Sequence, residues 1–245
     1  MFHVERIPNP PARAPRKRRC SAVAKTVLHT FDLFEPGEPR IGVVIGTGPS
    51  LTADQVASVS HLRTFGCNNA FEFGLDVHLA CNWQWWDTYW PQIRDYDCAK
   101  WTTRPESAAK YGIHYIAERW EPGLSTDPDY ICAHHGSGPQ IVNLALHYGC
   151  KVMLLIGWDM RYAGKINRHA YAAPRHYFGE YPSHLQHWPM TGPDGELEGL
   201  IREMQTITPA DYGVEIINCT ERSAMRCFPY RSLSACLTDF ELSRD

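Results

Sequence analysis

The sequence predicts an α/β fold in which a mainly parallel, doubly wound sheet carries helices on both faces. Two apolar runs at 41–46 and 151–157 are short and aliphatic, which is typical of strands buried on both faces of a parallel sheet. Thr52 and Gln55 form the capping-box pattern that begins a helix after the first run, and an apolar stripe over 140–148 predicts a helix before the second. This alternation of strands and amphipathic helices is typical of a Rossmann-like sheet.

The remaining segments continue the alternation. Further strands are predicted at 62–67, 76–81, 98–103, 112–117 and 214–217, a helix at 196–207, and a last helix or loop from about 221. The chain divides into a basic, proline-rich arm at 1–37 and a single domain at 38–245. Within the domain, 160–195 is rich in His, Tyr and Pro without a sustained period, so we expect a long, lid-like loop there.

Composition and charge exclude several classes of protein. Hydrophobic residues make up 44% and charged residues 21%, which is ordinary globular usage rather than that of a disordered or coiled-coil chain. No apolar run reaches the roughly 18 residues of a membrane span, and no secretory signal is evident, so we expect a cytoplasmic protein. The nine cysteines form no Cys-x-x-Cys pair, which argues against a disulfide framework and a zinc ribbon.

The net charge of −3 conceals an asymmetry. Residues 1–25 carry a charge of +6, which leaves −9 on the rest of the chain. The basic arm is suited to nucleic acid or to an acidic surface, while the alternative interpretation is a solvated terminal tail.

The leading motif is the turn after the first predicted strand, formed by Gly46, Thr47, Gly48, Pro49 and Ser50. A tight glycine turn lets backbone amides approach phosphate oxygens, and the following helix directs its positive end toward them. The turn lacks the third glycine of the dinucleotide fingerprint and the lysine of a P-loop. We therefore predict a phosphate site, with an ordinary tight turn as the alternative.

Asparagines follow the next two predicted strands. Asn68 and Asn69 follow one strand and Asn82 follows the other, so their amides are expected at the same sheet edge, where they can bind a base, a ribose or a phosphate. The alternative is that each caps a helix or turns the chain. The segment at 83–90 is dense in aromatic residues. Three roles are open for these rings: they stack on a ligand, pack in the core, or form a homo-oligomer interface.

Two further groups complete the candidate site. Ser137 and Gly138 open the helix at 140–148 and are expected to hold a ligand at its start, since no Gly-x-Ser-x-Gly elbow marks Ser137 as a nucleophile. Asp159 falls just past the second apolar strand, at the edge where open parallel sheets bind ligands. The histidines of 160–195 lack helical metal-ligand spacing, so no metal site is predicted there.

The order of these motifs resembles that of the bacterial CMP-sialic-acid-dependent sialyltransferases. The resemblance rests on 46–51, 67–68, Asn82, 137–138 and 156–159, and it covers about 41–235. The same core resembles archaeal hydroxymethyl-dihydropterin pyrophosphokinases and small bacteriophage-encoded proteins. The phage proteins are the most similar group, through 176–182 and 218–229.

The resemblance implies a nucleotide bound by the glycine turn, Asn68, Asn82 and Ser137, with transfer to an acceptor at the strand edge. In the sialyltransferases a His that closes a His-Tyr-x-Gly-His segment is the general base, whereas the matching segment here ends in Glu180. A carboxylate deprotonates a hydroxyl only when burial or a neighbouring charge raises its pKa. A tyrosine that helps the phosphate depart in the family is displaced here to Tyr162, behind Arg161.

Three hypotheses follow. The first is a glycosyltransferase that uses a nucleotide-sugar donor of the CMP type, without an essential metal. Its candidate bases are Glu180, His176 and His184, which would take the acceptor proton. Tyr162, Tyr177 and Arg161 are expected to stabilise the nucleotide as it leaves. The second is diphosphate transfer from Mg²⁺-ATP, with Asp159 holding the metal. The third is a non-catalytic module that binds nucleotides, or nucleic acid through the basic arm.

Overall fold

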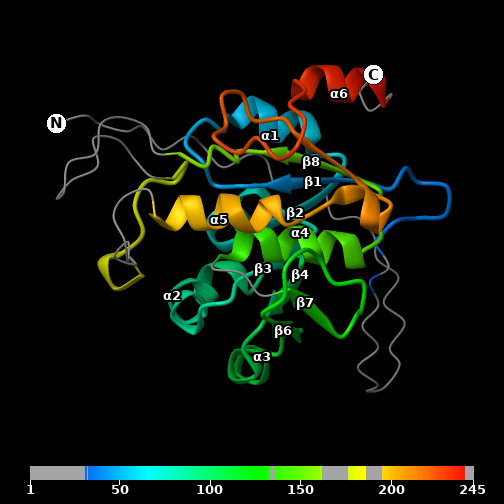
Figure 1. Cartoon of the computed structure of the whole chain (residues 1–245). Coiled ribbons are helices and arrows are strands. Elements are labelled where there is room, and N and C mark those ends of the chain that lie inside the picture. Colours follow the sequence, from blue (N-terminus) through cyan, green and yellow to red (C-terminus); the bar gives the residue numbers. More distant parts are fainter. Residues whose placement is uncertain (1–30, 32, 133–135, 162–175, 186–194, 241–245) are drawn as a thin grey trace, which may run out of the picture.

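A seven-stranded, all-parallel sheet forms the centre of the molecule (Figure 1). The structure is a computed structural model that describes residues 31, 33–132, 136–161, 176–185 and 195–240. The strand order is β5-β4-β3-β2-β1-β8-β9. The strands are β1 (Ile41–Ile45), β2 (Arg63–Cys67), β3 (Val77–Leu79), β4 (Ala99–Thr102), β5 (His114–Tyr115), β8 (Val152–Ile156) and β9 (Glu215–Asn218).

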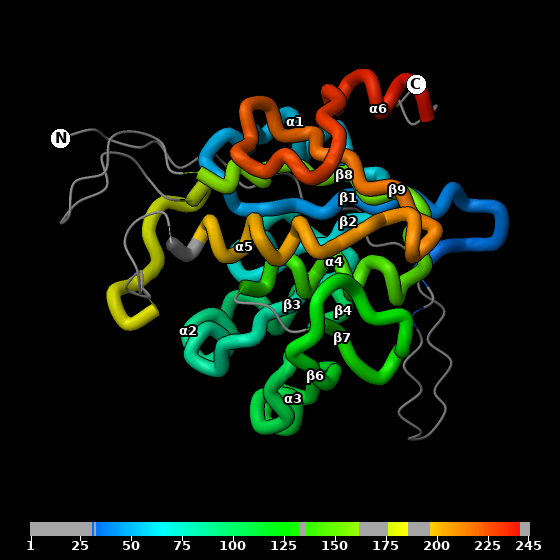
Figure 2. The backbone as a smooth tube through the Cα atoms, in the orientation of Figure 1, coloured from blue at the N-terminus to red at the C-terminus, as the bar shows by residue number. Residues whose placement is uncertain are grey.

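Helices lie on both faces of the sheet, as Figure 2 shows. They are α1 (Ala53–Val59), α2 (Trp83–Ile93), α3 (Pro105–Tyr111), α4 (Ser137–His147), α5 (Gly195–Gln205) and α6 (Leu233–Asp239), with short 3₁₀ helices at Asn68–Phe73, Ser183–Leu185 and Pro209–Tyr212. A separate parallel pair consists of β6 (Ala117–Arg119) and β7 (Tyr130–Cys132).

Strand β1 shows how the two layers form. Val44 belongs to the core cluster that includes residues of α4 and α5, whereas Val43 and Ile45 belong to the cluster that includes residues of α1 and α6. Successive side chains of a strand point to opposite faces, so a strand covered on both sides must be apolar throughout. This arrangement confirms the predicted α/β fold with a parallel, doubly wound sheet.

The structure also corrects parts of the prediction. The aromatic segment 83–90 lies in α2, which was not predicted as a helix, and Trp85, Trp86 and Tyr89 are buried there. The strand predicted at 112–117 is split between β5 and β6, and the pair formed by β6 and β7 was missed. The tail from about 221 contains one short helix, α6.

Helix α1 begins with the predicted capping box. The Thr52 hydroxyl accepts from the Gln55 N–H, and the Gln55 side chain accepts from the Thr52 N–H. Because a cap of this kind satisfies otherwise unpaired helix donors, Thr52→Ala is expected to lower the free energy of unfolding by about 1 kcal/mol. Urea unfolding tests this, and Thr52→Ser, which keeps the hydroxyl, should retain the wild-type value.

Candidate functional site

The sheet changes direction between β1 and β8. From β1 the chain adds β2, β3 and β4 on one side, whereas β8 and β9 pair on the other side. In open parallel sheets this switch creates a crevice outside the carboxyl ends of the two central strands. The turn at 46–50 follows β1 and the segment 157–159 follows β8, so two of the predicted segments meet at this position.

The glycine turn contacts the end of β8 closely. The Gly48 N–H donates to the Gly157 carbonyl at 2.8 Å. The Ser50 hydroxyl donates to Asp159 Oδ2 at 2.9 Å, and the Ser50 N–H points at the same oxygen at 3.4 Å. These turn donors are therefore directed at protein acceptors, and the anion that the turn holds is the Asp159 carboxylate.

Asp159 is buried at this position, with 6% of its surface exposed. Burial raises the pKa of its carboxyl group, whereas the hydrogen bonds from Ser50 and the nearby charge of Arg161 act to lower it. The next residue, Met160, has a φ of 49°, a left-handed conformation that residues other than glycine rarely adopt.

Trp158, which was not predicted as a site residue, contacts three of the predicted segments. A Cβ atom on Gly46 would lie 3.1 Å from its indole ring, and a Cβ on Gly138 would lie 3.3 Å from the same ring. Its Nε1–H donates to the Val44 carbonyl at 3.0 Å. The glycines at 46 and 138 thus allow the turn and the start of α4 to pack against one buried ring.

The chain after β9 supports this segment from the other side. The Trp158 N–H donates to the Thr220 hydroxyl at 2.9 Å, and the Ser223 hydroxyl donates to the Trp158 carbonyl at 2.6 Å. The Ala224 N–H donates to the Asp159 carbonyl at 2.8 Å. These contacts fix the backbone that carries Trp158 and Asp159.

The segment at 176–181 lies over the glycine turn. The Tyr177 N–H donates to the Thr47 carbonyl at 2.7 Å, and His176 Nδ1 lies 3.2 Å from the Thr47 hydroxyl. The Tyr177 ring packs at 5.2 Å against Phe73, so its position is that of a packing residue. The turn therefore contacts two predicted titratable groups, His176 through Thr47 and Asp159 through Ser50.

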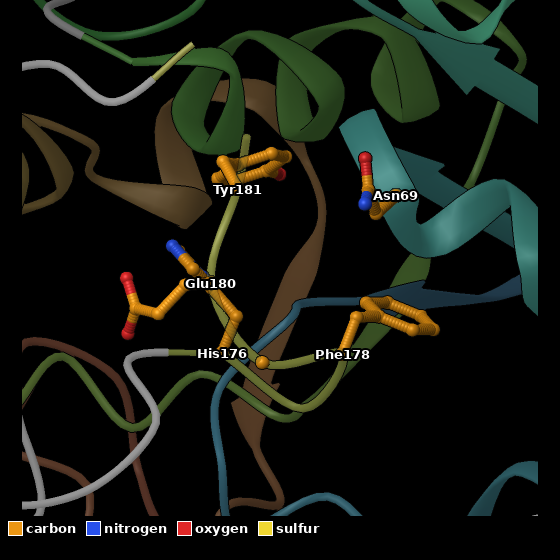
Figure 3. Close-up of a pocket in the computed structure, with 6 residues that line it drawn as sticks. Asn69, His176, Phe178, Glu180 and Tyr181 are labelled. Atoms are coloured by element: carbon orange, nitrogen blue, oxygen red, sulfur yellow. The ribbon is translucent and has the colours of Figure 1, made fainter. Parts of the chain in front are cut away.

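A small cavity lies beside His176 (Figure 3). Its lining residues are Asn69, His176, Phe178, Gly179, Glu180 and Tyr181. Figure 3 shows the Glu180 carboxylate directed away from Asn69. The cavity volume is about 10 Å³, which is the room of a single water molecule. A nucleotide needs a larger opening than these described residues leave.

Asn69 lines this cavity, but its side chain also bonds to α2. The Trp85 Nε1–H donates to Asn69 Oδ1 at 2.9 Å, and Asn69 Nδ2–H donates to the Tyr89 hydroxyl at 3.1 Å. These buried bonds join the end of β2 to the aromatic face of α2. In this structure the amide of Asn69 is engaged in packing.

Removing that amide is expected to destabilise the fold. Asn69→Ala leaves the buried Trp85 indole N–H without its acceptor, which costs about 2 kcal/mol in the free energy of unfolding. Urea unfolding measures this loss. Gln92→Ala on the exposed side of α2 is the control and should change stability by less than about 0.5 kcal/mol. Equal effects of the two substitutions would contradict the structural role of Asn69.

The neighbouring Asn68 has a left-handed backbone with a φ of 50°. Its carbonyl lies 2.9 Å from Nε2 of His78, a fully buried residue of β3. Burial lowers the pKa of His78 to about 3, although the bond to Asn68 acts in the opposite direction. A neutral imidazole that donates from Nε2 therefore holds the Asn68 peptide at the carboxyl end of β2.

The structure places the other predicted residues as follows. Asn82 is an exposed N-cap of α2 without a capping bond from its side chain. The side chain of Ser137, at the start of α4, forms a hydrogen bond with the Cys81 thiol. Burial raises the pKa of that thiol to about 11. His184 Nε2 lies 2.9 Å from the Thr88 hydroxyl on α2, so this histidine contacts α2.

Some predictions fall outside the described residues. Tyr162, most of the lid-like segment and residues 1–30 of the basic arm lie there. Within the described residues, no three His, Cys, Asp or Glu side chains gather as metal ligands. No helix among those residues is long and apolar enough to cross a membrane.

The aromatic residues of α2 mostly pack inside the protein. Trp85, Trp86 and Tyr89 are buried in one aromatic cluster, whereas Trp83 is 56% exposed. Trp90 lines a separate surface hollow of about 320 Å³ with Arg94, Lys100 and His114, near the start of β4. The ring of Trp90 thus borders a hollow at the amino ends of the edge strands, whereas the predicted ligand edge lies at the carboxyl ends.

Comparisons with known proteins assign no family to this chain, since no family model, no curated protein and no solved structure matches it. The sialyltransferase resemblance therefore rests on the motifs alone. What stands independently of it is the all-parallel α/β sheet and the contacts at its switch point.

Proposed function

We propose that the chain is a transferase that binds a nucleotide-activated sugar outside the carboxyl ends of β1 and β8. One observation carries the proposal: the turn at 46–50 contacts both Asp159 and His176, so predicted segments far apart in the sequence meet at the switch point. Support for a nucleotide comes from this position, because doubly wound sheets bind their ligands there. Support for the sugar donor comes from the order of the motifs.

His176 is the base that the geometry favours among the three candidates. It contacts the turn through Thr47, whereas His184 contacts α2 and the Glu180 carboxylate points away from Asn69. In the proposed reaction the imidazole takes the proton of the acceptor hydroxyl. The acceptor oxygen then bonds to the anomeric carbon, and the nucleotide leaves with the electron pair of the broken C–O bond.

A nucleotide panel tests the binding step. Isothermal titration of the full chain with CMP, UMP, GMP and their sugar conjugates should show that at least one of them binds, with the heat of binding above background. If none binds, the proposed function is wrong. Binding that requires Mg²⁺ would favour diphosphate transfer, with Asp159 as the metal ligand.

The catalytic step is tested by His176→Gln. We expect hydrolysis of the bound nucleotide sugar, with water as acceptor, to fall by at least about 100-fold, while nucleotide affinity stays within a factor of about 3. His114→Gln is the matched control, because His114 stacks on Trp101 at the far edge of the sheet, and it should retain the wild-type rate. A His176→Gln chain with the wild-type rate would exclude His176 as the base.

A further inference from the structure

The Asp159 carboxylate occupies the position that an anionic ligand of the glycine turn would take. A Cβ atom on Gly48 would lie 1.9 Å from Asp159 Oδ2, so this oxygen lies directly against the Gly48 backbone. The same oxygen accepts from the Ser50 hydroxyl. The absence of a side chain at position 48 therefore makes room for a carboxylate of this chain.

N–H and hydroxyl donors of the turn already form hydrogen bonds within the protein. The Gly46 and Gly48 N–H groups donate to the carbonyls of Ile156 and Gly157, each at 2.8 Å. A hydroxyl has only one proton, so Ser50 cannot donate to Asp159 and to a phosphate at the same time. A phosphate group at the turn must therefore take Ser50 away from Asp159.

Charge leads to the same conclusion. A phosphate placed beside the Asp159 carboxylate meets a like charge in a buried environment, where repulsion is stronger than in water. In the part of the chain that the structure describes, Arg161 is the cation that acts on Asp159, while Thr220, Ser223 and Ala224 bring neutral groups to this segment. The left-handed Met160 follows directly, and a change of its φ to the ordinary negative range would redirect the chain at Asp159.

We propose that Asp159 is an internal competitor of the ligand phosphate: its carboxylate closes the glycine turn in the free protein and must leave it when the nucleotide binds. This inference rests on the proposed function and adds its regulation. Binding of a nucleotide to the wild-type chain is then weakened, because the contact between Ser50 and Asp159 must be broken first.

Asp159→Asn tests the inference, since it removes the charge and nearly keeps the shape. Using the nucleotide that binds the wild-type chain most tightly, calorimetry should show at least about tenfold tighter binding to the variant. The corresponding nucleoside, which has no phosphate, should bind both chains with equal affinity. Asp54→Asn is the matched control, because Asp54 is an exposed carboxylate in the first turn of α1, and it should change nucleotide affinity by less than about twofold.

The outcomes separate the inference from the function. If the wild-type chain binds a nucleotide and Asp159→Asn binds it equally or more weakly, the inference is wrong and the proposed function stands. If neither chain binds any nucleotide of the panel, both are wrong. Should Asp159→Asn fail to fold, Asp159→Ala carries the same expectation, because it removes the charge and also frees the Ser50 donors.

Discussion

Acidification from pH 7 to pH 4 is expected to remove about 3 kcal/mol of folding free energy through His78 alone. The buried imidazole stays neutral in the folded chain because its pKa is lowered from 6.5 to about 3. The unfolded chain therefore binds a proton that the folded chain does not bind. The contribution of His78 to stability is complete above pH 6.5 and is lost as the pH falls toward 3.

Urea unfolding at the two pH values measures this effect, with His78→Gln as the test variant. The amide can still donate to the Asn68 carbonyl but does not titrate, so the variant should lose about 3 kcal/mol less than the wild-type chain on acidification. His184→Gln is the control, since it removes an imidazole from the surface, and it should keep the acid sensitivity of the wild type. An unchanged acid dependence in His78→Gln would show that His78 is protonated in the folded chain.

Most of the sheet could be predicted from the sequence, because each pattern that indicates a strand or a helix lies within a few consecutive residues. The run at 41–46 and the capping box at Thr52 each lie within a few residues, and the structure contains β1 and α1 there. Helix α2 was not predicted, because additional aromatic residues such as the exposed Trp83 obscure the helical spacing of its buried face, and Pro91 lies inside it. Such a helix is stabilised by tertiary contacts, among them the hydrogen bonds that Asn69 accepts from Trp85 and donates to Tyr89.

The site was predictable as a place and less so as a set of contacts. Topology brings the turn at 46–50 and Asp159 to one edge of the sheet, and this follows from parallel strands with a change of winding direction. That the carboxylate bonds to Ser50 depends on two residues 109 positions apart, and no local pattern encodes this pair. The same holds for Trp158, whose neighbours Gly46 and Gly138 come from distant segments.

Replacing Gly48 by alanine is expected to destabilise the fold strongly. The new Cβ would lie 1.9 Å from Asp159 Oδ2 and 2.6 Å from the Gly157 carbonyl oxygen. The carboxylate can turn away, but the carbonyl belongs to the backbone between β8 and Trp158. Gly48→Ala should therefore disrupt the contact between the turn and β8, with a loss of more than about 3 kcal/mol or failure to fold.

Gly199→Ala is the matched control for this substitution. Gly199 lies inside α5, where a new Cβ atom would meet, among the described residues, only the end of Arg202 at 3.9 Å, so alanine should raise stability by about 0.5–1 kcal/mol. Thermal and urea unfolding of both variants compare the two glycines directly. A phosphate-binding glycine needs open space before the ligand arrives, whereas Gly48 is already in contact with this chain. A Gly48→Ala chain of wild-type stability would mean that the turn stands open in the free protein, which contradicts the contact between Gly48 and Asp159.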